Sequence, residues 1–153
     1  MKSAILALSA LALVSAAPSF AASAKGAAVK IELGTGTPKN KEEMVFSKAT
    51  LSVKAGAKVT LTFKNNSTSK GMTHNFVLVK PGKAQAVIDA SVAAGPDKGW
   101  VAESADIIAK GKLVDAGESE TIEFTAPSEP GEYPYICTFP GHTTMKGTMK
   151  VTK

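Results

Sequence analysis

The chain has 153 residues, of which 18 are basic and 13 acidic, and its formal net charge is +5 at pH 7. All 18 basic residues are lysine and none is arginine. Because arginine is the side chain best suited to bidentate contacts with phosphates and bases, this composition argues against a nucleic-acid-binding protein. The length is that of one domain with a sizeable hydrophobic core.

The N-terminus has the three parts of a secretory signal peptide. A lysine at the second position precedes a short apolar run at residues 4–14, and small residues follow this run. The run is shorter than the roughly 20 residues that a membrane-spanning helix needs. Cleavage is predicted after Ala21 or Ala24, so residues 1–21 form the signal peptide and residues 22–153 the mature single domain. The sequence therefore predicts export to the periplasm and no membrane-spanning segment.

Short segments rich in valine, threonine and phenylalanine follow, separated by glycine, proline and asparagine. In one of them, Val59, Leu61 and Phe63 alternate with Thr60 and Thr62, as expected for a strand with one buried and one wet face. About seven or eight such strands with turns between them predict an all-β fold, an antiparallel sandwich or barrel. The expected strands are residues 28–33, 44–47, 51–63 (split by a turn at 54–56), 74–79, 120–124, 131–137 and 147–152.

Residues 83–95 interrupt this β pattern. They are rich in alanine, and their apolar side chains from Ala84 to Val92 follow helical spacing up to a glycine–proline pair that ends the helix. The chain beyond the helix is irregular, apart from one short strand at residues 107–108. We therefore expect residues 83–117 to form a short helical flap on the sandwich.

The C-terminal motif CTFPGHTTM holds the only cysteine of the chain, Cys137, close to His142 and Met145. Structural cysteines of exported proteins usually occur in pairs, so a lone cysteine is a buried thiol, half of an intermolecular bridge or a metal ligand. The only other histidine, His74, opens a predicted strand. Two imidazoles, a thiolate and a thioether are the ligands of a blue-copper electron-transfer site. The proline and glycine of the motif would turn the chain so that its three ligands face one point, which His74 completes.

The ligand preferences of the two copper oxidation states explain why nitrogen and sulfur donors are combined. Cu(II) favours nitrogen and oxygen ligands and Cu(I) favours soft sulfur, so mixed ligation suits both oxidation states. Each residue also has an ordinary explanation, because His74 could be a surface residue and Met145 a core residue, and Met149 competes as the axial ligand. The combination uses both histidines and the sole cysteine, and it therefore favours a copper electron carrier over these separate explanations.

The stretches HNFVLVKPG, GEYPYICTFPGH and MKGTMKV resemble the cupredoxins, and azurin and auracyanin in particular. The resemblance covers nearly all of the mature chain and implies a cupredoxin-like Greek-key fold. It implies a small soluble protein that shuttles single electrons and holds one type 1 copper ion, which cycles between Cu(II) and Cu(I). The copper ligands carried over from the family are His74, Cys137, His142 and Met145.

The resemblance also implies roles for residues next to these ligands. In the family, an asparagine after the first histidine hydrogen-bonds to the residue after the cysteine, and Asn75 and Thr138 match those positions. Azurin has a glycine before the first histidine whose carbonyl approaches copper, and Thr73 takes that place here. Only two residues separate His142 from Met145, a step shorter than in azurin and similar to that in amicyanin.

In the family, the edge of the second histidine reaches the surface within a ring of apolar residues. The resemblance therefore implies electron exchange through His142 with redox proteins such as cytochromes or copper or haem enzymes. Such encounters are brief and bury little area, and the chain is expected to be a monomer. The residues expected around His142 are Met72, Phe139, Pro140 and Gly141.

Other functions remain open at this point. A periplasmic copper carrier or storage protein is the main alternative, but carriers are often methionine-rich, and the five methionines of this chain include the initiator and are scattered. A copper enzyme with a second metal site needs further histidines, and none is left in the sequence. A cysteine–histidine nucleophile needs an orienting group and an oxyanion hole, which the Phe-Pro-Gly linker does not offer. We therefore expect that the protein is not an enzyme.

Overall fold

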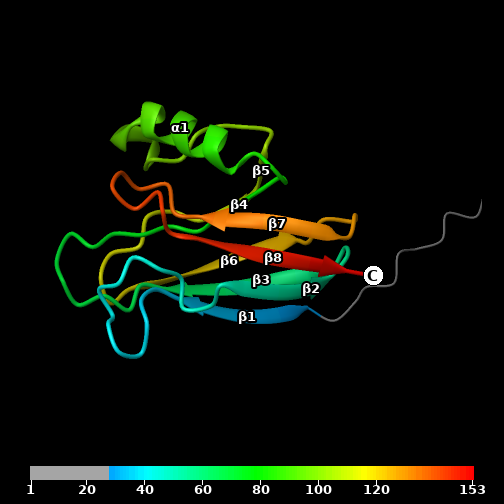
Figure 1. The fold of residues 1–153 in the computed structure, drawn as a ribbon, viewed down its shortest axis with the longest axis horizontal. Helices are drawn as coiled ribbons and strands as arrows, with labels where there is room; N and C mark the ends of the chain where they lie inside the picture. Colours follow the sequence, from blue (N-terminus) through cyan, green and yellow to red (C-terminus); the bar gives the residue numbers. More distant parts are fainter. Residues whose placement is uncertain (1–27) are drawn as a thin grey trace, which may run out of the picture.

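The computed structural model describes residues 28–153, which form two β-sheets around a shared core with a helix outside them (Figure 1). The predicted signal peptide and both predicted cleavage sites lie outside the described residues. The first sheet has the strand order β1-β3-β6 and the second the order β2-β8-β7-β4-β5. The strands are β1 (Val29–Gly34), β2 (Thr50–Lys54), β3 (Lys58–Lys64), β4 (Val77–Val79), β5 (Ile107–Lys110), β6 (Ser119–Thr125), β7 (Gly131–Ile136) and β8 (Lys146–Thr152).

The core lies between the two sheets, and the alternation of side chains along the strands builds it. On β3, Val59, Leu61 and Phe63 are buried while the two threonines between them are partly exposed, as the sequence predicts. Leu78 and Tyr135 reach the same core from the second sheet, and both are fully buried. Burying one such side chain contributes roughly 1.5–3 kcal/mol, so these contacts hold the sheets together.

The sheets are mixed: the predicted antiparallel pairing holds for four strand pairs, and two pairs are parallel. β1 runs parallel to β3, and β2 runs parallel to β8. The remaining neighbours, β3-β6, β4-β5, β4-β7 and β7-β8, are antiparallel. The chain moves to the second sheet at β2 and returns to the first at β3, so β1 and β3 point the same way. Side-chain alternation reports which face is buried but not the direction of the neighbouring strand.

Two predicted strands differ from the structure at one end of the sandwich. Residues 44–47 do not form a strand, because Phe46 makes only an isolated bridge to Thr35. Phe46 is buried all the same, with its ring 5.0 Å from that of Tyr135. The predicted strand at residues 74–79 is shorter, since β4 begins at Val77 and His74 makes only an isolated bridge to Val114.

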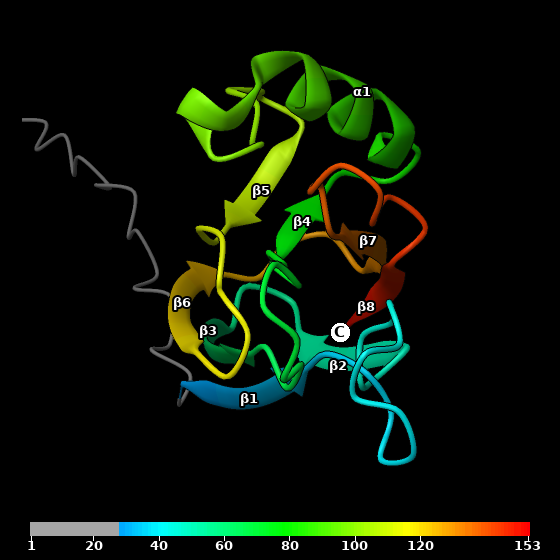
Figure 2. The ribbon, with the colours of Figure 1, turned by 90° about the vertical axis from the view of Figure 1, so that its left-hand side faces the viewer.

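The flap segment contains the expected helix, α1 (Ala84–Ala94), followed by a short 3₁₀ helix, η1 (Pro96–Lys98). Figures 1 and 2 show α1 lying over the outer face of the second sheet. Val87 and Ile88 of α1 pack there against a second apolar cluster that includes Val77 and Ile136. β5 contains the short strand predicted at residues 107–108, and it pairs with β4 at the edge of the second sheet.

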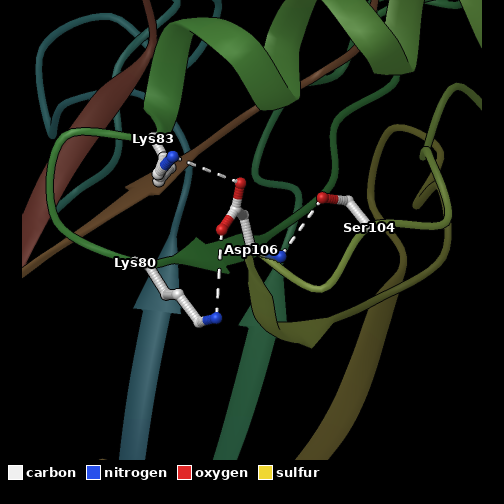
Figure 3. A network of polar contacts seen from close by, with 4 residues as sticks. All are labelled: Lys80, Lys83, Ser104 and Asp106. Atoms are coloured by element: carbon white, nitrogen blue, oxygen red, sulfur yellow. Dashed lines mark hydrogen bonds and ion pairs between the residues drawn. The ribbon is translucent and has the colours of Figure 1, made fainter.

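Two ion pairs join the chain just before α1 to the chain just before β5 (Figure 3). The carboxylate of Asp106 lies 3.9 Å from the ammonium of Lys80 and 3.8 Å from that of Lys83, and the backbone N–H of Asp106 donates to Ser104 Oγ at 3.2 Å. Pairs this exposed contribute little, about 0–1 kcal/mol each. The apolar contacts of Val87 and Ile88 therefore hold the flap on the sheet. Within residues 28–153, no helix is both long enough and apolar enough to cross a bilayer.

Candidate metal centre

Loops from four parts of the chain meet at one end of the sandwich, on the left in Figure 1 and facing the viewer in Figure 2. They connect β1 to β2, β3 to β4, β5 to β6, and β7 to β8. Cys137 directly follows the last residue of β7, and Met145 directly precedes β8. His74 lies in the loop before β4. The sheets thus bring to one place two segments that are 63 residues apart in sequence.

One side-chain donor atom from each of His74, Cys137 and His142 lies within 4.8 Å of the other two. Cys137 Sγ is 3.9 Å from His74 Nδ1. The two imidazole rings are tilted by 31°, and their centroids are 4.5 Å apart. Only 1% of the surface of His74, 0% of that of Cys137 and 7% of that of His142 is exposed. Three donor atoms in this arrangement can converge on one ion.

The loop after β7 is closed by three backbone hydrogen bonds. The N–H of His142 donates to Phe139 O at 3.0 Å, and the N–H of Met145 donates to His142 O at 2.9 Å. The N–H of Cys137 then donates to Met145 O at 3.1 Å, which brings both ends of the loop together. Gly141 has φ 85°, a left-handed conformation that glycine adopts without a steric penalty.

Met145 is 1% exposed and belongs to the same buried cluster as Cys137. Its competitor Met149 is also fully buried, but it lies inside β8, opposite Tyr133 of β7. Met149 is thus part of the strand pair, whereas Met145 is in the loop that carries Cys137 and His142. Met145 is therefore the buried methionine in the loop that carries Cys137 and His142.

Hydrogen bonds hold the His74 segment against the β7–β8 loop. Asn75 Nδ2 donates to Thr138 Oγ1 at 2.9 Å, and the N–H of Thr138 donates to Asn75 Oδ1 at 2.9 Å. Both side chains are fully buried. The backbone of His74 also exchanges two hydrogen bonds with Val114, at 3.1 and 2.8 Å. The two ligand segments are therefore fixed to each other, and the His74 segment is also fixed to the β5–β6 loop.

The Thr73 carbonyl oxygen lies 3.1 Å from His142 Nδ1, which places it beside the cluster. Because a carbonyl oxygen only accepts, the contact is a hydrogen bond when Nδ1 carries the proton.

The residue observed beside His142 is Phe139. The Phe139 ring is half-buried with its centroid 5.1 Å from that of His142, and Met72 and Pro140 are half-buried as well. Gly141 is exposed. These four residues lie in the two loops that carry His74 and His142.

Burial is the main cause of the pKa shifts of His74, Cys137 and His142. It lowers the pKa of His74 to about 4, and the charge of His142 adds to the effect. Burial also lowers the pKa of His142, against the hydrogen bond to the Thr73 carbonyl, which raises it. Burial raises the pKa of the Cys137 thiol. Two neutral imidazoles and a displaceable thiol proton, with no carboxylate among them, fit a soft transition metal and not a hard cation.

Asn65 is a residue that the sequence analysis missed. Its fully buried amide nitrogen donates to Met72 O at 2.6 Å and to Val114 O at 2.9 Å. Its side-chain oxygen accepts from Thr35 Oγ1 and from the Ser67 N–H, both at 3.1 Å. Asn65 therefore joins three loops of this end of the molecule. The sequence marks it as a loop residue only, because nothing local distinguishes it from its neighbour Asn66.

The fold and the site together define a class of protein. Two β-sheets hold two imidazoles and a thiol in a dry cluster at one end, with a buried methionine in the same loop. This is the donor set of a type 1 copper site, and such a protein is an electron carrier.

A family model described as copper binding proteins, plastocyanin/azurin family, matches residues 32–152. The chain belongs to this family, which confirms the resemblance to cupredoxins. It is 42% identical to auracyanin-A of Chloroflexus aurantiacus over 127 residues, or 80% of this chain and 74% of that protein. It is 32% identical to azurin of Pseudomonas aeruginosa over 115 residues, or 71% of this chain and 78% of that protein.

Solved structures support the same assignment. Dithionite-reduced auracyanin from Roseiflexus castenholzii superposes with a TM-score of 0.73 at 38% identity, covering 84% of this chain and 100% of that one. Auracyanin A from Chloroflexus aurantiacus, described as a "blue" copper protein, gives a TM-score of 0.72 at 40% identity, covering 82% and 99%. These neighbours confirm the predicted all-β sandwich with a short helix.

Proposed function

We propose that His74, Cys137 and His142 would hold the copper ion of this electron-transfer protein and that Met145 would be its fourth ligand. The convergence of the first three donors within 4.8 Å, in a chain of the plastocyanin/azurin family, carries this proposal. When bound, copper supplies a one-electron couple between Cu(II) and Cu(I). The Thr73 carbonyl, 3.1 Å from His142 Nδ1, is close enough to the cluster to act as a weak further contact.

The surrounding hydrogen bonds keep the donors in place. The amide of Asn75 and the hydroxyl of Thr138 join the two ligand segments, and three backbone bonds close the loop that carries Cys137 and His142. Such outer contacts orient metal ligands and are needed for affinity. Donors held in this way move little when an electron arrives, which keeps the barrier to electron transfer low.

Electrons reach the site through the exposed edge of His142. That residue is 7% exposed, whereas the other two donors of the cluster are almost fully covered. The apolar surface beside it, formed by Met72, Phe139, Pro140 and Gly141, is the docking patch for brief encounters with redox proteins such as cytochromes or copper or haem enzymes. We propose that the protein acts there as a monomer in the periplasm after removal of its signal peptide.

We propose no catalytic role. The sequence has only two histidines and one cysteine, and this site uses all three. A second copper site of the kind that oxidases use would lack its imidazoles.

The visible spectrum of the copper-loaded protein tests the proposed function. We expect an intense blue or green band that a mild reductant bleaches and an oxidant restores. Cys137→Ser removes the thiolate and should abolish the band, whereas Ser69→Ala, at an exposed position of the β3–β4 loop that is not a donor, should keep it. A colourless protein that binds zinc tightly and shows no reversible band would instead indicate a trafficking or storage role.

A further inference from the structure

Trp100 lies in the flap segment after η1, in a backbone conformation that is unfavourable for its side chain. Its φ is 56°, in the left-handed region, where a bulky residue is an outlier. The residue before it, Gly99, has φ 59° and tolerates this region, as glycines do. A large side chain persists in such a conformation only where its surroundings hold it there. Trp100 is held by contacts with residues of the loop that carries Cys137 and His142.

The backbone of Trp100 is hydrogen-bonded on both sides. Its N–H donates to Gly95 O at 3.0 Å, within the flap. Its carbonyl oxygen accepts from Thr138 Oγ1 at 2.6 Å. That hydroxyl, on the residue after Cys137, also accepts the bond from Asn75. One buried hydroxyl therefore connects the flap, the His74 segment and the Cys137 loop.

The indole makes a second connection. Its ring meets the ring of Phe139 nearly edge-on, with centroids 6.3 Å apart and an angle of 80°. Phe139 in turn lies 5.1 Å from the imidazole of His142. Edge-to-face contacts at this spacing are attractive and directional. The indole therefore restrains Phe139, and Phe139 restrains the ring of His142.

The segment that carries Trp100 is itself fixed to the helix. Val101 and Ala102, the next two residues, are buried at 7% and 6% exposure. The N–H of Ala102 donates to the fully buried Ser91 Oγ of α1 at 3.0 Å. Because α1 is held on the sheet by Val87 and Ile88, the position of Trp100 is set by the whole flap.

We propose that Trp100 is a positioning residue for the copper site, which it holds at two points. Its carbonyl fixes Thr138, and its indole fixes Phe139 and through it the ring of His142. The flap is thereby coupled to the geometry of the metal ligands, and its docking on the sheet tunes the midpoint potential and the visible band. This inference rests on the proposed function.

A first experiment uses the protein without metal. Trp100 is the only tryptophan, and excitation at the long-wavelength edge, where the two tyrosines do not absorb, makes the fluorescence report on it alone. Thr138→Val removes the hydroxyl that binds the Trp100 carbonyl, and Thr138→Ser keeps it. We expect Thr138→Val to move the emission to longer wavelength and to increase quenching by acrylamide, and Thr138→Ser to resemble the wild type. Unchanged emission and quenching in Thr138→Val would overturn the proposal. Far-ultraviolet circular dichroism shows that each variant is folded.

A second experiment uses the copper-loaded protein. Trp100→Gly removes the indole and suits the left-handed backbone, so it is expected to fold, and Trp100→Phe keeps an aromatic ring. Val92→Ala is the matched control, because Val92 is exposed on α1 of the same flap. We expect Trp100→Gly to shift the visible band and the midpoint potential, Trp100→Phe to restore most of both, and Val92→Ala to leave both unchanged. A wild-type band and potential in Trp100→Gly would refute the proposal.

A double-mutant cycle tests whether the two connections act together. Trp100→Gly removes the indole contact and leaves the backbone carbonyl that binds Thr138, whereas Thr138→Val removes that hydrogen bond. Because both contacts hold the same loop, their effects should couple by about twofold or more in affinity. We therefore expect Trp100→Gly and Thr138→Val together to weaken copper binding by a factor that differs at least about twofold from the product of their separate effects. Additive effects would contradict the coupling. If the wild type shows no blue band at all, the proposed function fails, and the fluorescence experiment still decides whether Trp100 is held by Thr138.

Discussion

Cys137 and His74 show at the residue scale how burial prepares the site. Burial raises the pKa of the thiol and lowers the pKa of the imidazole to about 4, so both side chains are neutral near pH 7. A cysteine–histidine nucleophile requires the opposite, a thiolate stabilised by a protonated imidazole. A metal cation that displaces the thiol proton can bind the resulting thiolate and the lone pairs of both neutral imidazoles. The electrostatics therefore favour metal binding over covalent catalysis.

Met145 gives the first prediction at this scale. Met145→Leu conserves volume but removes the thioether, and loss of a donor from a dry pocket disfavours the more highly charged Cu(II). We expect this variant to keep copper and its colour and to have a higher midpoint potential, measured by redox titration. Met149→Leu is the control, because Met149 is equally buried but lies within β8. Complete loss of copper from Met145→Leu would show that the axial role is misassigned.

Glu42 gives a prediction about pH. Its carboxylate accepts from the Ser67 hydroxyl and from the N–H and hydroxyl of Thr68, at 2.8 and 3.0 Å for the latter two. These bonds, that of Ser67 first, lower the pKa of Glu42 from 4.5 to about 2. A carboxyl group with a depressed pKa stabilises the fold above its unfolded-state pKa, and the contribution is lost as the pH falls through its folded-state pKa.

The stabilisation by Glu42 should therefore be complete above pH 4.5 and disappear as the pH falls to about 2. Glu42→Gln should lower the melting temperature near pH 7 and flatten its decline in acid, measured by thermal unfolding across this range. Glu123→Gln, at an exposed position of β6, is the control and should keep the wild-type decline. An identical acid dependence in Glu42→Gln and the wild type would contradict the assigned hydrogen bonds.

The pairing of β7 with β8 shows what one glycine does at the scale of an element. Tyr135 of β7 is directly opposite Gly147 of β8. A Cβ atom at residue 147 would overlap the Tyr135 ring, so the absence of a side chain there makes room for it. The ring is fully buried and stacks on Phe76 at 5.5 Å. Gly147 is thus required by close approach and not by its backbone angles.

We expect Gly147→Ala to displace Tyr135 and to destabilise the protein by about 1–3 kcal/mol, the usual cost of overpacking a core. The measurement is chemical denaturation followed by circular dichroism. Gly131→Ala is the control at the far end of β7, because a Cβ there would meet the Tyr133 ring no closer than 3.5 Å. Equal unfolding free energies for the two variants would rule out the steric role of Gly147.

At the scale of the whole molecule, the metal centre is an extension of the core. Cys137 and Met145 belong to the same apolar cluster as Leu61 and Phe63 of the first sheet and Tyr135 of the second. The packing of the two sheets therefore places the ligands before any metal binds. In such a protein the metal adds to the stability of a fold that forms without it, unlike in small domains that fold only around a metal.

Copper should accordingly raise the melting temperature without being needed for folding. A ligand present at 100 times its dissociation constant stabilises the folded state by about 2.7 kcal/mol. We expect the chelator-treated protein to keep its β-sheet spectrum at 25 °C and to melt at a lower temperature than the loaded form. Cys137→Ser should show a much smaller copper-dependent increase. A chelated protein that is unfolded at 25 °C would contradict this view of the core.

Local sequence was sufficient for features that depend on nearby residues. Alternation along residues 59–63 placed Val59, Leu61 and Phe63 in the core, helical spacing located α1, and the spacing of Cys137, His142 and Met145 identified one loop with three candidate donors. Strand periodicity and turn chemistry are properties of a few consecutive residues, so they can be read without the fold.

Contacts between distant segments required the tertiary structure. It decided that β1 and β3 are parallel, that residues 107–110 form an edge strand, and that His74 meets Cys137. It also decided that Trp100 is hydrogen-bonded to the loop of the metal centre. The contact of His74 with Cys137, for example, joins residues 63 apart, and such contacts depend on which surfaces pack together, not on the local pattern. The amino-acid sequence by itself therefore determined the kinds of donor and their local order, and only the packing of the two sheets brought them to one point.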